Sequence, residues 1–240
     1  NAGIAQAEAD LVVMASAHVY PVYPDWLETL LAPFTIARVA LTYGKQRGAP
    51  VSHFSEQQIF RTWYPEHSVA GQGFPFCNNA NAAIRRSLWQ EHPYDESLPG
   101  LEDLAWAKWA QENGASLHYV AEAEVIHVHN ESTVGIFNRY RREGMAFKQI
   151  YPDEKFTLGD LVKYFCQNVI SDGREARLAK RFISTIGKII RFRWLQFFGT
   201  YQGYRQSGPL TWQLKKAFYY PVSPVQAKTP ARKVEPIQYN

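Results

Sequence analysis

Short apolar runs alternate with amphipathic helical patterns through the first 130 residues, and this alternation constrains the fold more than any other feature. Strands are predicted at residues 11–15, 39–43, 117–120 and 124–129. Helices are predicted at residues 26–31, 56–62, 82–90 and 101–112. Strands that alternate with helices favour an α/β domain with a mostly parallel sheet, in which ligands bind at the carboxyl ends of the strands.

The composition excludes several other classes of protein. Of the 240 residues 46% are apolar, which is enough for a packed core and excludes a disordered chain. The sequence has no apolar run long enough to cross a membrane. Two cysteines cannot form a disulfide framework or a four-cysteine zinc site, so we expect reduced thiols in a cytoplasmic protein.

Charge divides the chain into an acidic body and a basic segment. Residues 1–154 hold 11 basic and 18 acidic side chains, whereas residues 155–220 hold 12 basic and 3 acidic ones. We therefore predict an α/β domain over residues 1–150, a basic amphipathic helical region over 151–220 and an extended Pro-rich tail over 221–240. The basic helix suits an anionic membrane surface, but its apolar side could equally pack on the α/β domain or on a second copy. The acidic body argues against nucleic acid as a partner.

Two groups of residues could carry chemistry. Glu102 and Asp103 open a predicted helix, where a carboxylate could act as a general base or could simply cap the helix. His127 and His129 lie two residues apart at a strand end, so both imidazoles face one side and could reach one metal ion or phosphate. His18, at the end of another strand, could join them. A hydrogen-bonded surface pair is the simpler interpretation of these histidines.

Amide and guanidinium groups gather between residues 78 and 86. Asn79 and Asn81 offer donors and acceptors that suit a polyhydroxylated or phosphorylated ligand, with Arg85 supplying positive charge nearby. The same asparagines could serve only to form a turn, with Asn81 capping the helix 82–90, and Arg85 could lie on a solvated helix face.

Taken in order, several segments resemble the second half of a family-2 glycosyltransferase with the GT-A fold, a Rossmann-like domain. The matching segments are residues 9–21, 25–27, 43–46, 77–86, 94–96, 101–106 and 125–129. The resemblance covers about residues 1–150, and the region after Phe156 is similar to the trailing helices of bacterial members that build surface polysaccharides. The chain opens with a helix that leads straight into a buried strand, so we expect it to be a fragment that lacks the first, nucleotide-binding half.

The resemblance implies inverting transfer of a sugar from a nucleotide-sugar donor to the hydroxyl of a saccharide or lipid-linked acceptor, at the cytoplasmic face of a bacterial membrane. By position, Asp103 would be the general base and Glu102 would orient the acceptor. Family members hold a divalent cation, Mg²⁺ or Mn²⁺, with an Asp-X-Asp sequence and a late histidine. Ser16 and His18 occupy the Asp-X-Asp place here, and His127 or His129 is the late histidine.

Two other functions are compatible with this sequence. A non-catalytic carbohydrate-binding or scaffold protein derived from the same fold would account for the loss of both carboxylates at residues 16–18. A histidine-based metal hydrolase would explain His18, His127 and His129, but the sequence has no helix-borne pair of metal ligands to support it.

Overall fold

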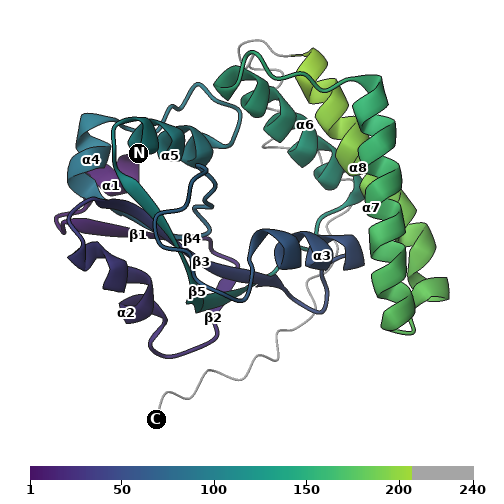
Figure 1. Cartoon of the computed structure of the whole chain (residues 1–240), viewed down its shortest axis with the longest axis horizontal. Helices are drawn as coiled ribbons and strands as arrows, with labels where there is room; N and C mark the ends of the chain where they lie inside the picture. Colours follow the sequence, from purple (N-terminus) through teal and green to yellow (C-terminus); the bar gives the residue numbers. More distant parts are fainter. Residues whose placement is uncertain (207–240) are drawn as a thin grey trace, which may run out of the picture.

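A computed structural model describes residues 1–206 and shows a five-stranded sheet with helices on both faces and a helical layer at one side (Figure 1). The strands are β1 (Leu11–Ala15), β2 (Val19–Pro21), β3 (Val39–Gly48), β4 (Asn81–Arg85) and β5 (Ser116–His127). The α/β class predicted from the sequence is confirmed. The predicted Pro-rich tail 221–240 lies outside the described residues, as do residues 207–220 of the basic region.

The sheet is mixed, which corrects the prediction of a mostly parallel one. Its strand order is β1-β4-β3-β5-β2, and β3 pairs in parallel only with β5, while the other neighbours are antiparallel. The prediction failed because periodicity identifies a strand but not its direction. Nor did it join the predicted strands 117–120 and 124–129, which form one strand, β5, that ends at His127 and whose register against β3 shifts between Gly44 and Gln46.

Two apolar clusters sandwich the central strands. On one face the sheet packs against α1 (Ala2–Gln6), α4 (Arg86–Glu91) and α5 (Glu102–Glu112), with Trp106 and Leu41 almost fully buried. The other face is covered by α2 (Trp26–Leu31) and the 3-10 helix η1 (Ala32–Thr35).

Residues 82–84 show why one predicted helix is wrong. Ala82, Ala83 and Ile84 have no exposed surface and lie in strand β4 between the two clusters, so burial on both faces overrides their helical propensity. The helix α4 begins only at Arg86, and Asn81 starts a strand instead of capping a helix.

The helical layer consists of α3 (Phe54–Trp63), α6 (Thr133–Ile150), α7 (Leu158–Leu178) and α8 (Phe182–Arg205). The basic region forms two antiparallel helices, because the chain reverses over residues 179–181, where Lys180 has φ 56°. α6 and α8 approach closely through Gly144, Gly199 and Gly203. A Cβ at Gly199 would lie 2.8 Å from the carbonyl oxygen of Phe137, so only glycine fits there.

A buried ion pair joins α7 and α8 to each other and to α3. The Nε and Nη2 of Arg193 donate to the two carboxylate oxygens of Asp172 at 2.8 Å each, and both side chains are almost fully buried. Arg193 Nη2 also donates to the carbonyl oxygen of Ser55 at 3.4 Å. The orientation of the α7–α8 hairpin is thereby fixed relative to α3.

Candidate functional site

The structure brings His18, His127 and His129 together at one edge of the sheet. His18 follows β1, and its carbonyl accepts a hydrogen bond from Val128, between the other two histidines. The ring of His127 lies 4.0 Å from that of His129 and 4.8 Å from that of His18, centroid to centroid. One nitrogen from each ring lies within 4.8 Å of the other two, a spacing that a single metal ion can bridge.

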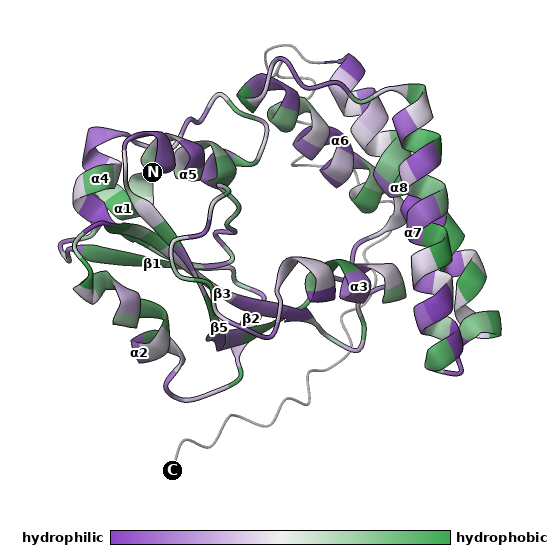
Figure 2. Ribbon diagram, in the orientation of Figure 1, coloured by the Kyte–Doolittle hydropathy of each residue, from purple (hydrophilic) through white to green (hydrophobic). Residues whose placement is uncertain are grey.

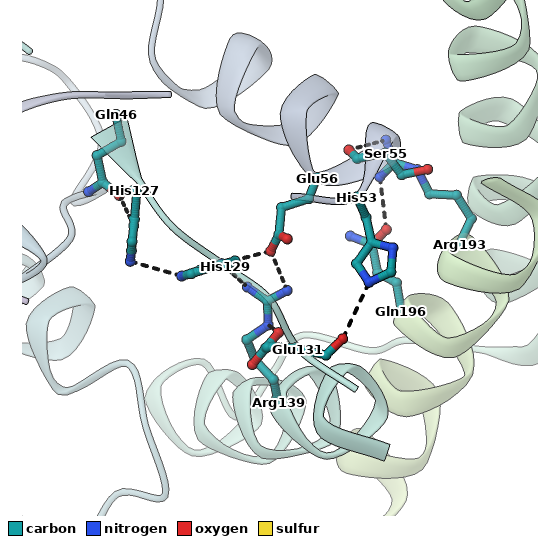
Figure 3. A network of polar contacts seen from close by, with 10 residues as sticks. All are labelled: Gln46, His53, Ser55, Glu56, His127, His129, Glu131, Arg139, Arg193 and Gln196. Atoms are coloured by element: carbon teal, nitrogen blue, oxygen red, sulfur yellow. Dashed lines mark hydrogen bonds and ion pairs between the residues drawn. The ribbon is translucent and has the colours of Figure 1, made fainter. Parts of the chain in front are cut away.

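Two oxygen acceptors fix the orientation of the two later histidines (Figure 3). The Oε1 of Gln46, on β3, lies 2.6 Å from Nδ1 of His127, and the Oε1 of Glu56, on α3, lies 2.7 Å from Nδ1 of His129. The amide oxygen of Gln46 favours a proton on Nδ1 of His127, which leaves the Nε2 of that ring with a lone pair for a donor or a metal ion. Nδ1 of His129 faces both the carboxylate of Glu56 and, at 3.2 Å, the Nη1 of Arg139.

The two Nε2 atoms point toward each other, with a separation of 2.8 Å. At that distance one ring can donate a hydrogen bond to the other, and a metal ion bound to both nitrogens would replace this contact. His127 is buried and His129 is half-buried, whereas His18 is exposed. The Oγ of Ser16 lies 3.0 Å from Nδ1 of His18. The cluster therefore has a fixed inner side and an open outer side.

Glu56 is held ionised at the inner side of this cluster. It is almost fully buried, and burial raises its pKa, but the hydrogen bond with His129 and the charge of Arg139 lower the pKa more, so the net shift is downward. Nη2 of Arg139 donates to its Oε1 at 2.6 Å, and Nε of Arg139 lies 2.9 Å from a carboxylate oxygen of Glu131. Burial, with the neighbouring His129 and His18, lowers the pKa of His127 to about 3, so this imidazole is neutral.

Asp103 and Glu102 open α5, as the sequence predicts. The Oδ2 of Asp103 accepts from the backbone N–H of Asn79 at 3.0 Å, and its Oδ1 accepts from that of Leu104 at 2.8 Å. Burial and the adjacent Glu102 raise the pKa of Asp103 to about 6, more than these two hydrogen bonds lower it. Leu101, directly before the pair, has φ 57°, a left-handed backbone that is strained for a non-glycine residue.

An open cleft of about 690 Å³ lies beside this carboxylate pair, between β1 and α5. It is lined by Met14, Asn79, Tyr94 and Glu102, among others. The hydroxyl of the buried Tyr94 donates to Oδ1 of Asn79 at 3.2 Å. This hydrogen bond orients the Asn79 amide at the edge of the cleft.

Two helices connect the carboxylate pair with the histidine cluster. On α6, Arg139 contacts the cluster, while Arg142, one turn further on, lies against Gly100, where a Cβ would be 3.4 Å from its Nε. On α3, Phe60 lies 5.7 Å from the rings of His127 and His129, and Tyr64 follows one turn later beside Phe76. Cys77, next in the chain, donates to the carbonyl of Asp103.

Asn81 and Arg85 make contacts inside the sheet and not at a ligand surface. The amide of Asn81 is completely buried, donates to the carbonyl oxygen of Ala123 at 2.8 Å and accepts from the indole N–H of Trp26. The guanidinium of Arg85 donates to the carbonyl oxygens of Val39, Phe34 and Ile36, so its charge ties η1 to the sheet. The structure does not bring these two residues to the histidine cluster.

Sequence reasoning missed Gln46, Glu56 and Arg139. Gln46 and Glu56 come from a stretch that reads as a loop-rich connection, and Arg139 is one of several cations on a long helix. Glu56 alone carried a signal, because it is an acidic residue in the first turn of a predicted helix and turns out to be 2% exposed. No model of a known protein family matches the chain, and none of the curated proteins matches it significantly.

Proposed function

We propose that the protein is a glycosyltransferase that moves a hexose or deoxyhexose from a nucleotide-sugar donor to the hydroxyl of a saccharide or lipid-linked acceptor. The reaction would belong to bacterial surface polysaccharide synthesis. The observation that carries the proposal is the linkage of two unlike centres by α3 and α6. One is a cluster of three imidazoles suited to a cation, and the other is a half-buried carboxylate with a raised pKa.

Asp103 is assigned as the general base. A base works best when its pKa lies just below the working pH, because it is then both ionised and a good proton acceptor. A pKa of about 6 meets this condition, whereas an ordinary exposed aspartate is a weaker base. The two backbone N–H groups hold the carboxylate in place, and Glu102, which lines the cleft, is assigned to orient the acceptor hydroxyl.

The cation is assigned to His18, His127 and His129. The convergence of the two Nε2 atoms, with each ring held by a contact at its Nδ1, fits a metal site. A bound divalent ion would offset the negative charge that develops on the leaving diphosphate. Imidazole ligands suit Mn²⁺ or a later transition metal better than Mg²⁺, which prefers oxygen, so Mn²⁺ is the better candidate of the two ions that the resemblance implies.

The decisive experiment is a nucleotide-release assay of the complete enzyme with a panel of nucleotide sugars, Mn²⁺ and saccharide acceptors. Asp103→Asn should lower turnover at least about a thousandfold and leave donor binding almost unchanged, because it removes a proton acceptor and no phosphate contact. Glu112→Gln, on the exposed end of the same helix, is the matched control and should keep full activity. Donor binding without turnover in the parent chain would favour the non-catalytic carbohydrate-binding function.

A further inference from the structure

The hairpin of α7 and α8 ends in the most exposed large aliphatic side chains of the described residues. Ile183 is 92% exposed and Leu178 is 78% exposed, and they flank the reversal at residues 179–181. Aliphatic side chains that are exposed to this degree at a helix tip gain nothing from contacts with the described residues, so they indicate a contact with something beyond these residues.

Five basic residues lie within five positions of Leu178 or Ile183 in the sequence. Arg174, Arg177, Lys180, Arg181 and Lys188 are all exposed, and none of them forms an ion pair with a carboxylate in the described part of the chain. The guanidinium of Arg177 lies 4.6 Å over the ring of Phe182, which holds one of these charges at the tip. Apolar and hydrophilic residues both reach this end of the hairpin (Figure 2).

The reversal between α7 and α8 places a lysine, Lys180, in a left-handed backbone conformation. Lys180 has φ 56°, and the N–H of Arg181 donates to the carbonyl of Ala176 at 2.8 Å, which is the hydrogen bond of a Schellman helix end. Glycine is the usual residue at this left-handed position, because a side chain is strained there. Lysine therefore occupies a position where the fold alone would be better served by glycine.

The middle of α8 is occupied within the chain, whereas Ile170 on α7 and Ile190 and Trp194 on α8 stay 44–55% exposed. α8 packs on α6 through the glycine contacts and on α7 through the Arg193–Asp172 pair, with Ile189 and Phe192 buried. Of the two interpretations of the basic region, packing on the chain thus accounts for the middle of α8 but not for its tip. Leu178 lies six residues beyond Asp172, about 9 Å further along the helix.

We propose that the α7–α8 tip is an anchor for an anionic lipid surface, with Leu178 and Ile183 inserted among the acyl chains and the neighbouring cations bound to lipid phosphates. Two exposed aliphatic side chains close to several lysines and arginines match such a surface, which has an apolar acyl layer beneath anionic headgroups. No helix of the described residues is long and apolar enough to cross a membrane. Because the buried Arg193 bonds to Asp172 and to Ser55 on α3, it would fix the distance between the anchored tip and the histidine cluster.

The test is co-sedimentation of the full chain with vesicles of phosphatidylcholine and phosphatidylglycerol in equal parts, at low and high salt. Leu178→Ser with Ile183→Ser should weaken partitioning at least about tenfold at both salt concentrations. Arg177→Gln, Lys180→Gly and Arg181→Gln together should weaken it about a hundredfold at low salt only. Ile36→Ser, which alters an aliphatic side chain 47% exposed on the α/β body, is the control and should bind as the parent does.

Three results would overturn the proposal. The first is a parent chain that does not bind these vesicles at low salt, and the second is a Leu178→Ser, Ile183→Ser variant that binds them as well as the parent does. The third is a parent that sediments as a dimer in the ultracentrifuge and becomes monomeric in that variant, which would make the tip a contact between copies of the chain. Circular dichroism melting of every variant shows whether the fold is retained, and Lys180→Gly should melt no earlier than the parent.

Discussion

Arg193 on α8 and Asp172 on α7 form a buried ion pair in which both carboxylate oxygens accept a hydrogen bond from one guanidinium. Such a pair is costly to break on one side only, because the remaining charge stays buried without a partner. The pair lies where three helices meet, since Arg193 also donates to the carbonyl of Ser55 at the start of α3.

Removing one partner of this pair should strongly destabilise the chain. Asp172→Ala is expected to lower the free energy of unfolding by about 3–5 kcal/mol, measured by urea denaturation followed by circular dichroism. Glu175→Ala, three residues further along α7, is the control and should change it by less than about 1 kcal/mol. Equal effects of the two substitutions would show that the ion pair has no special weight.

Gly199 should not tolerate alanine. An added Cβ would lie 2.8 Å from the carbonyl oxygen of Phe137 and 3.2 Å from the backbone nitrogen of Arg141, which would force α6 and α8 apart. A loss of about 1–3 kcal/mol is expected. Gly187→Ala on the same helix meets no atom within 4 Å and should instead stabilise the chain by about 0.5–1 kcal/mol, because alanine favours a helix. A stabilised Gly199→Ala variant would contradict the close packing.

The rate of sugar transfer should depend on pH through Asp103. Its pKa of about 6 means that the carboxylate becomes protonated as the pH falls through 6, and a protonated carboxyl cannot accept the acceptor's proton. We expect kcat to fall about tenfold for each pH unit below 6 and to be level above about 7. A profile that is flat between pH 5 and pH 8 would exclude Asp103 as the base.

Cation binding should require the three histidines together. Mn²⁺ added to the full chain is expected to raise its melting temperature, and His127→Ala should abolish the shift. His67→Ala, an exposed histidine that lies outside the cluster, is the matched control. An unchanged shift in His127→Ala would place the Mn²⁺ elsewhere.

Glu56 should act through His129 as a positioning residue. Glu56→Gln keeps an oxygen and the side-chain size but removes the charge that pairs with His129 and Arg139. Mn²⁺ affinity is expected to fall about 10–100-fold, measured by isothermal titration calorimetry. The Glu131→Gln variant, altered at an acidic residue nearer the surface, should lose less. Equal affinities of Glu56→Gln and the parent would show that Glu56 only stabilises the fold.

The sequence predicts the individual strands and helices well where local pattern and burial agree. The helix at 26–31 and the strand at 11–15 have the bounds that the apolar runs indicate. It fails where a long-range contact decides, as at Ala82–Ile84, whose helical propensity yields to burial on both faces of the sheet. Strand direction is likewise invisible in the pattern.

The candidate site is predictable in part for the same reason. His127 and His129 share a face because side chains alternate along extended backbone, which a sequence reveals. Their acceptors, Gln46 and Glu56, are 81 and 73 residues distant in the chain, and only the pairing of β3 with β5 and the packing of α3 on β3 bring them to the histidines. For Arg85 the sequence suggests a ligand contact, because a cation lies beside asparagines. In the structure its guanidinium donates to three backbone carbonyl oxygens instead.

Because β2 is a short edge strand, we expect His18 to move more than His127 and His129. β3 lies at the centre of the sheet with Val39–Tyr43 almost fully buried, so amide hydrogen exchange there requires global unfolding. β2 has three residues and one neighbour, and it frays at much lower free energy. His18 directly precedes it, so the cluster opens at His18 while His127 and His129 stay in register. Exchange of a bound ion would therefore be governed by the breathing of one edge strand and not by the stability of the domain.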